Sequence, residues 1–219
     1  MTTSLLRLMQ LCSQTLPVGA YAYSQAQEYA IATDVVNDAA SAELWIMGVF
    51  TDGLGRLDLP ALALAYRAVE NKNWTALDDL NEYLQASRET RELLLEDIEM
   101  GRSMQRLLKS LQLDNGVTSR PSFVTQFACA GVCCSIDLQD LMTGFSYSWL
   151  ENQVMVASKS VPIGQSESQK ILYKLGDSVP VTVAKALELA EEADFGTSLH
   201  GLAILSARHE VMEARLYRS

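Results

Sequence analysis

Apolar residues recur every three or four positions along most of this chain, which is the spacing of one face of an α-helix. The first run, Leu5 to Cys12, ends before Pro17 and Gly19, where proline and glycine disfavour continuation of a helix. The same spacing predicts further helices over residues 21–32, 44–50, 61–69, 74–85, 88–113, 123–134, 138–159, 165–175, 179–193 and 201–215. We therefore expect an all-α fold: a single compact, bundle-like domain over residues 1–219, with about eight to ten helices.

Two stretches of turn-forming residues interrupt the later helices. Apolar spacing stops between residues 113 and 122, and this stretch is predicted to be a surface loop inside the domain. A tighter turn is predicted at Pro162, Gly164 and Gln165, where the glycine supplies unusual backbone angles and the glutamine caps the next helix. Both features are interpreted as structural.

The break at Pro17 and Gly19 has consequences for the residues that follow it. A rigid break between two helices could present Tyr21 and Tyr23 together on the surface. Simple packing of these two rings in the core explains them equally well, so both interpretations stay open.

Composition and charge limit the classes of function. Hydrophobic residues make up 48% of the 219 residues, enough for a full core. The net charge of -10 argues against non-specific binding to nucleic acid, which requires clustered Lys and Arg. No apolar run reaches the roughly 20 residues needed to cross a bilayer, and the N-terminal stretch lacks the features of a signal peptide. We expect a cytoplasmic protein with reduced cysteines and no membrane partner.

The common catalytic motifs are missing from the sequence. No Gly-Lys pair is present, so a phosphate-binding P-loop is excluded. There are two histidines, His200 and His209, and the stretch His209 to Glu213 lacks the second histidine of a zinc-protease helix. We predict no catalytic residue, no resident metal and no cofactor.

Three cysteines on one predicted helix offer the main alternative chemistry. Cys129 and Cys133 are four residues apart, share a helical face, and could hold a soft metal together with Cys134. Their neighbours are small and apolar, which is typical of buried core thiols. Core packing is the favoured interpretation, and a thiol-based metal carrier or small helical enzyme is the alternative.

Carboxylates gather at Asp78–Asp79 and from Glu96 to Glu99, and both groups are interpreted as solvated helix faces. The pair Arg88 and Glu92, spaced by four residues, is assigned to a solvated face as well.

The C-terminal docking tail, residues 209–219, combines basic, apolar and aromatic side chains. Arg and Tyr are common anchors of protein interfaces, and Arg215, Tyr217 and Arg218 occur in close order. We expect a short free tail that buries its aromatic ring on meeting a partner. The alternative is a frayed end packed loosely on its own domain.

Several short motifs together resemble one family. Residues Leu16 to Gln25, followed by Glu28, are similar to the Leu-Pro-Val-Gly-Gly-Phe-Ser-Tyr-Ser signature of UreF urease accessory proteins, with Ala26 and Gln27 in place of the usual Gly and Leu. Four more segments follow in the family's order: Asp58–Pro60; Arg88–Thr90 with Glu96, Asp97 and Gly101; Glu151–Gln153 with Val161–Gln165; and His209–Glu210 with Arg215–Ser219.

This resemblance implies an all-α, non-catalytic protein that acts as a dimer. It would bridge UreD, also called UreH, and the GTPase UreG, and so help deliver nickel to apo-urease, UreABC. The residues expected to bind partners are Tyr21, Tyr23, Glu28, His209, Glu210, Arg215, Leu216, Tyr217, Arg218 and Ser219. A homo-oligomeric scaffold with no role in nickel delivery remains an alternative.

Overall fold

The computed structural model describes residues 2–113 and 120–219, and it confirms the predicted all-α fold. Helices make up 72% of the residues in these two ranges, which contain no strand. The elements are α1 (Thr2–Leu11), η1 (Ala20–Ala22), α2 (Gln27–Ala32), α3 (Ala39–Gly48), η2 (Val49–Leu54), α4 (Asp58–Glu70), α5 (Trp74–Ser87), α6 (Arg91–Ser110), α7 (Phe123–Cys133), α8 (Leu138–Ser160), α9 (Gln165–Gly176), α10 (Val179–Glu192) and α11 (His200–His209).

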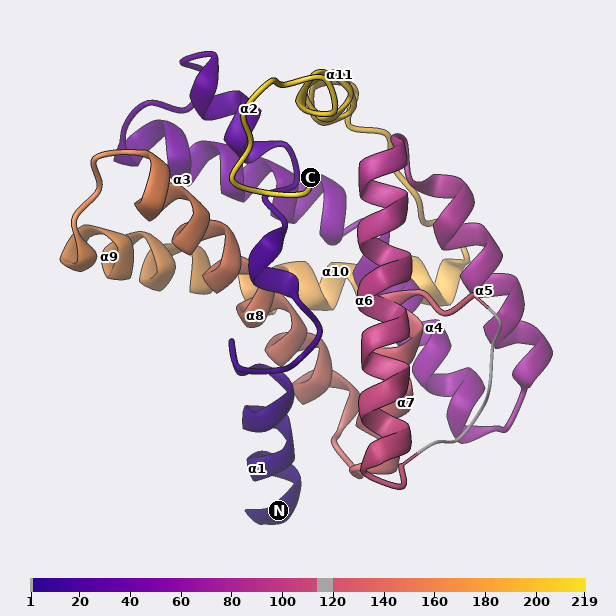
Figure 1. Cartoon of the computed structure of the whole chain (residues 1–219). Coiled ribbons are helices and arrows are strands. Elements are labelled where there is room, and N and C mark those ends of the chain that lie inside the picture. The colour runs from indigo at the N-terminus through magenta and orange to yellow at the C-terminus, as the bar shows by residue number, and fades with distance from the viewer. Residues whose placement is uncertain (1, 114–119) are drawn as a thin grey trace.

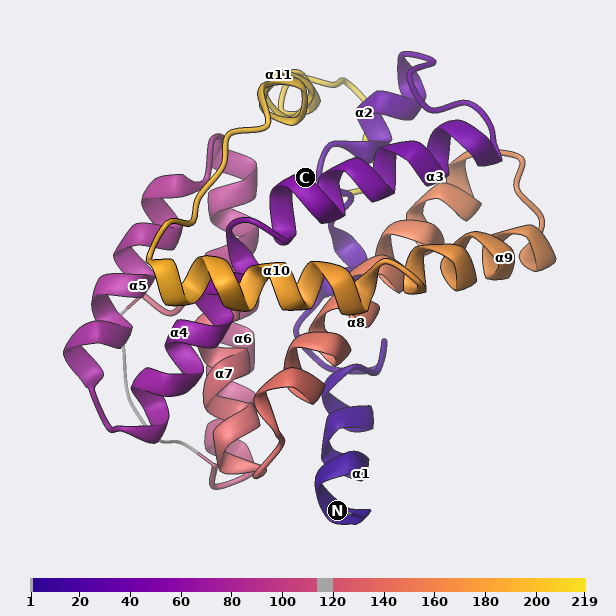
Figure 2. The same ribbon diagram turned by 180° about the vertical axis from the view of Figure 1, so that it is seen from behind.

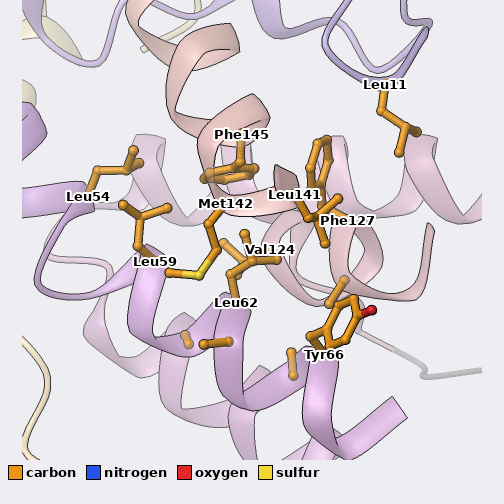
Figure 3. Close-up of a cluster of buried hydrophobic side chains, with 14 of the residues drawn as sticks. Leu11, Leu54, Leu59, Leu62, Tyr66, Val124, Phe127, Leu141, Met142 and Phe145 are labelled. Atoms are coloured by element: carbon orange, nitrogen blue, oxygen red, sulfur yellow. The ribbon is translucent and has the colours of Figure 1, made fainter. Parts of the chain in front are cut away.

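Helix α4 lies at the centre of the fold, and most of its side chains are apolar and buried. It packs against α5, α7, α8 and α10. Tyr66 also donates a hydrogen bond from its hydroxyl to the backbone oxygen of Ile136, 2.8 Å away, which ties α4 to the turn before α8. Figure 3 shows the apolar side chains that meet here: Leu59, Leu62, Val124, Phe127, Leu141, Met142 and Phe145.

Two glycines let neighbouring segments approach closely. A Cβ at Gly101 in α6 would lie 2.2 Å from the backbone oxygen of Pro121, just before α7. A Cβ at Gly144 in α8 would lie 2.6 Å from the sulfur of Cys12, which follows α1. Helix α1 thus packs on α8 through its last turn, while its first turn projects from the body of the molecule (Figure 1).

The opposite face of the molecule is a layer formed by α3, α9 and α10 (Figure 2). Helix α9 packs against both α3 and α8. An ion pair between Lys174 and Glu43, 3.0 Å apart, joins α9 to α3 at the surface. None of the helices within the described ranges has the length and hydropathy required to cross a membrane.

The predicted helix over residues 21–32 is not continuous. The chain forms the short helix η1, turns, and enters α2 through Gln25 and Ala26, whose φ angles are 51° and 65°. This left-handed region is unfavourable for residues other than glycine. The turn is therefore held by tertiary contacts, which the helical spacing could not reveal.

Other local predictions are corrected by the structure. Gly164 has an ordinary φ of −71° and is itself the N-cap, so neither the expected unusual backbone angles nor a cap at Gln165 is present. Gly19, by contrast, has a φ of 81° and does use glycine's conformational freedom. Of the predicted surface loop over residues 113–122, residues 114–119 lie outside the described part of the chain. The shared core supports the one-domain hypothesis, which stays a prediction.

Candidate functional site at the C-terminal segment

Residues 210–219, here called the C-terminal segment, fold back onto the N-terminal part of the chain. The segment leaves α11 and crosses to the chain around α2 (Figure 1). The backbone N–H of Arg218 donates to the oxygen of Ala22, 2.8 Å away, and the N–H of Ser24 donates to the oxygen of Ser219 at 2.9 Å. The predicted helix over 201–215 therefore ends early, at His209, because long-range contacts fix the residues beyond it.

The carboxylate of Glu28, in the first turn of α2, holds the backbone of this segment. Its Oε1 accepts a hydrogen bond from the N–H of Leu216 at 2.7 Å, and its Oε2 accepts one from the N–H of Tyr217 at 3.0 Å. Glu28 is buried, and hydrogen bonds to an ionised acceptor are stronger than neutral ones. One side chain therefore fixes two consecutive peptide groups.

His209, the last residue of α11, lies between two carboxylates. Its Nδ1 is 2.7 Å from Oε2 of Glu92, its Nε2 is 3.0 Å from Oε2 of Glu28, and its side chain is 0% exposed. Ionised carboxylates only accept hydrogen bonds, and a neutral imidazole has a single N–H, whereas both ring nitrogens of His209 face carboxylate oxygens. Two hydrogen bonds therefore require a second proton, either on the ring or on one of the two carboxyl groups. Arg215 donates to the other oxygen of Glu92 and brings a compensating positive charge. These four residues are called the His209 cluster below.

A second set of hydrogen bonds leads from Ser219 into the molecule. The Ser219 hydroxyl donates to Oε2 of Glu96 at 2.7 Å, and Nε2 of Gln25 donates to Oε1 of Glu96 at 2.7 Å. The indole N–H of Trp149, on α8, donates to Oε1 of Gln25 at 2.9 Å. Burial raises the pKa of Glu96 to about 7, although the hydrogen bonds from Ser219 and Gln25 oppose that shift.

Next to Glu96, Asp97 belongs to a structural ion cluster. Arg88 lies 2.6 Å from a carboxylate oxygen of Asp58 and 3.4 Å from one of Asp97. The same oxygen of Asp97 accepts hydrogen bonds from the hydroxyl of Ser122 and the N–H of Phe123. This cluster joins the starts of α4 and α7 to α6. Burial raises the pKa of Asp97, and the charge of Arg88 opposes the shift.

A cavity of about 150 Å³ opens beside the second set of hydrogen bonds. Its lining includes Tyr21, Gln25, Glu96, Trp149 and Asn152, together with apolar side chains from α1, α6, α7 and α8. The amide of Asn152 donates to the backbone oxygen of Tyr23, 3.2 Å away, so α8 also holds the N-terminal segment that forms part of this wall. The hydrogen bonds that fix the C-terminal segment thus reach one wall of the cavity.

The expectation of a free tail is wrong, because the segment is anchored in its own chain. Burial of Tyr217 within the molecule leaves its side chain 7% exposed, and the same environment raises its pKa. The predicted docking residues separate into two groups. Those buried in the molecule are Tyr23, Glu28, His209, Tyr217 and Ser219. Those with outward surface are Tyr21, Glu210, Arg215, Leu216 and Arg218.

The outward group contains one clear apolar anchor. Leu216 is 79% exposed although its own N–H is fixed by Glu28. Arg218 is exposed beside it. Glu210 pairs with Arg91 on α6 at 3.3 Å. The segment therefore presents an apolar side chain and a cation on a backbone whose position is already set.

Of the three cysteines at the end of α7, Cys129 lies in the core, and Cys133 and Cys134 are half-buried. Cys129 is buried, and the thiol of Cys133 donates to the backbone oxygen of Leu113, 3.0 Å away. Within the described ranges, no group of three or more His, Cys, Asp or Glu side chains is arranged to hold a metal ion. The geometry gives the alternative of a thiol-based carrier no support.

The sequence interpretation missed the acidic side of α6. Glu92, Glu96 and Asp97 are buried, so their assignment to solvated faces is wrong. The Arg88–Glu92 pair is wrong too, since Arg88 binds Asp58 and Glu92 binds His209. A signal was present: Glu92 and Glu96 continue the four-residue spacing of the buried stripe that runs on through Met100, Met104 and Leu108.

Comparison with known proteins adds the family relationship. A family model described as UreF matches residues 36–176. The urease accessory protein UreF of Teredinibacter turnerae is 46% identical over 222 residues, covering 100% of both chains. That of Chromohalobacter salexigens is 42% identical over 215 residues, covering 97% of this chain and 93% of the relative. The first of these matches spans the whole chain, so it includes both the turn before α2 and the C-terminal segment.

Proposed function

Because the chain belongs to the UreF family of urease accessory proteins, we propose that it bridges UreD (UreH) and UreG during nickel delivery to apo-urease, UreABC. In this role it is a non-catalytic, cytoplasmic homodimer that binds other proteins rather than a substrate. Nickel is the cargo of the assembly, and the chain needs no resident metal or cofactor. The family relationship over the whole chain carries this proposal.

The C-terminal segment is the docking site in this proposal. Leu216 and Arg218 project from it, while Glu28 fixes the peptide groups of Leu216 and Tyr217. A side chain held on an ordered backbone loses less conformational entropy on binding than one on a free tail. The complementary partner surface is an apolar pocket beside an acidic group. Exposed Tyr21, which lines the cavity close to the segment's attachment, extends the same surface.

The proposal is tested by mixing the chain with its cognate UreD and UreG and following co-elution by size exclusion. The double variant Leu216→Asp, Arg218→Glu changes the outward side chains and keeps the side chains of Glu28, His209 and Ser219 that anchor the segment. Its control is Tyr173→Asp on α9, an equally exposed position on a different helix. Circular dichroism checks that all three proteins keep the same helix content.

We expect the wild type and the Tyr173→Asp control to co-elute with the partners, and the double variant to elute alone. Light scattering of the isolated chain should give twice the mass of one chain. No co-elution of the wild type would remove the bridging role. Co-elution of the double variant with unchanged affinity would place docking elsewhere than on the C-terminal segment.

A further inference from the structure

The second set of hydrogen bonds forms an unbroken series from the C-terminal segment to the cavity. It runs from Ser219 to Glu96 at 2.7 Å, from Glu96 to Gln25 at 2.7 Å, and from Gln25 to Trp149 at 2.9 Å. Both oxygens of Glu96 and both polar atoms of the Gln25 amide are used in this series. Loss of one link therefore leaves a buried polar group to find another partner.

The series passes through a backbone turn that is unfavourable on its own. Gln25 and Ala26 are consecutive left-handed residues, with φ angles of 51° and 65°, and neither is a glycine. Such a conformation persists where surrounding contacts impose it. Here those contacts are the hydrogen bonds of Ser24 to the oxygen of Ser219 and the two side-chain hydrogen bonds of Gln25.

The attachment of the segment depends on compensated charge. Glu28 and Glu92 face His209 from α2 and α6, and Arg215 from the segment itself faces Glu92. Close by, Glu210 pairs with Arg91 at the surface. A buried charge that loses its partner is strongly destabilising. Loss of any one member of the His209 cluster therefore weakens the attachment of the whole segment.

We propose that the C-terminal segment is a strap: while it is bound it holds the turn at Ser24–Ala26 in its left-handed form, and its release loosens the cavity wall at Trp149. The strap and the cavity wall share Glu96 and Gln25, so one cannot move without breaking hydrogen bonds of the other. A partner that lifts the segment would thereby change the cavity. The coupling itself belongs to the isolated chain and is tested without any partner, so its failure is distinct from failure of the bridging role.

The test is hydrogen exchange of the Trp149 indole N–H, measured by NMR on the full chain and assigned with Trp149→Phe. Two variants loosen the strap. Glu28→Ala removes the acceptor of the Leu216 and Tyr217 amides, and Ser219→Ala removes only the first link of the series. The matched control is Ser110→Ala, because the hydroxyl of Ser110 is exposed and binds only the backbone of its own helix.

We expect Trp149 indole exchange to become at least tenfold faster in Glu28→Ala, a few-fold faster in Ser219→Ala, and unchanged in Ser110→Ala. The Leu216 and Tyr217 amides should lose protection in Glu28→Ala. Retained protection of those amides in Glu28→Ala would contradict the attachment of the segment through Glu28. Lost protection with an unchanged exchange rate of the Trp149 indole would contradict the coupling between the segment and the cavity wall. If Glu28→Ala does not fold, Ser219→Ala decides, and unchanged Trp149 exchange in that variant overturns the proposal.

Discussion

Two buried regions of this molecule are held together by different forces. Around α7, Phe127 and Cys129 lie in an apolar core, and a Cβ at Gly131 would come within 2.2 Å of Leu141. Around the C-terminal segment, by contrast, burial covers the carboxylates of Glu28 and Glu92. Sequence reasoning singled out both regions as possible functional sites.

The difference indicates which region can move in the folded protein. Dispersion and hydrophobic burial are shared among many weak contacts, so no single group releases an apolar core. In the His209 cluster each charged group depends on one or two partners, so the loss of one partner weakens the whole attachment. We therefore assign an architectural role to the α7 region, and we expect the C-terminal segment to be the part that can be released.

The largest expected effect is in the apolar region. Phe127→Ala should lower the free energy of unfolding by about 4 kcal/mol, because it removes a fully buried ring and leaves a cavity. Leu216→Ala, at an exposed apolar position, should change it by less than about 0.5 kcal/mol. Urea unfolding followed by circular dichroism measures both. Equal losses would remove the distinction between core and surface anchor.

The next effect distinguishes the two histidines. His209→Ala should weaken attachment of the segment by about 3 kcal/mol, because Glu28 and Glu92 are left facing each other without the ring. His200→Ala, at an exposed position, should leave it unchanged. Native-state hydrogen exchange of the Tyr217 amide reports this free energy. A His209→Ala protein with wild-type protection would show that the cluster does not hold the segment.

A pH profile sharpens the contrast further. The folded-state pKa of Glu96 is raised from 4.5 to about 7, so folding favours its protonated form and stability is lost as pH rises between those values. The loss attributable to Glu96 is roughly 3 kcal/mol at most. Glu96→Gln, which keeps a neutral hydrogen-bonding group there, should lack this loss. Urea unfolding from pH 4.5 to 8 compares the wild type with Glu96→Gln. Superimposable profiles of stability against pH would contradict the attribution of this loss to Glu96.

The smallest effect concerns the strained turn. Ala30→Gly, in the middle of α2, should cost about 1 kcal/mol through helix propensity alone. Ala26→Gly should cost clearly less, or stabilise slightly, because glycine accepts the positive φ at that position without strain. Both alanines are fully buried, which makes them a matched pair. Thermal unfolding measures both, and an equal or larger cost at Ala26 would contradict the strain.

Local pattern predicted the long helices well and the polar site poorly. Helix α8, predicted over 138–159, is found at Leu138–Ser160, because a long apolar stripe identifies a helix without knowledge of its partners. The end of α11 at His209 and the turn at Ala26 depend on hydrogen bonds that join residues 24–28 to residues 216–219, and these two segments are far apart in the sequence. Helical spacing contains no information about such contacts.

The same limit applies within the candidate site. The sequence pointed to the C-terminal segment, but it gave Tyr217 the role of an outward anchor, whereas Leu216 is the exposed side chain. The buried carboxylates of Glu28 and Glu92 are bound by a histidine and an arginine from a distant part of the chain, and the spacing of apolar residues contains no information about such contacts.

The most direct test of this account is the exchange of the Leu216 and Tyr217 amides in the isolated wild-type chain at neutral pH. We predict that both amides are protected at least a hundredfold over an unstructured peptide, yet less than the amides of α7, because the segment opens without global unfolding. Exchange of both amides at the rate of an unstructured peptide would contradict it, since Glu28 would then not hold the C-terminal segment in the free protein.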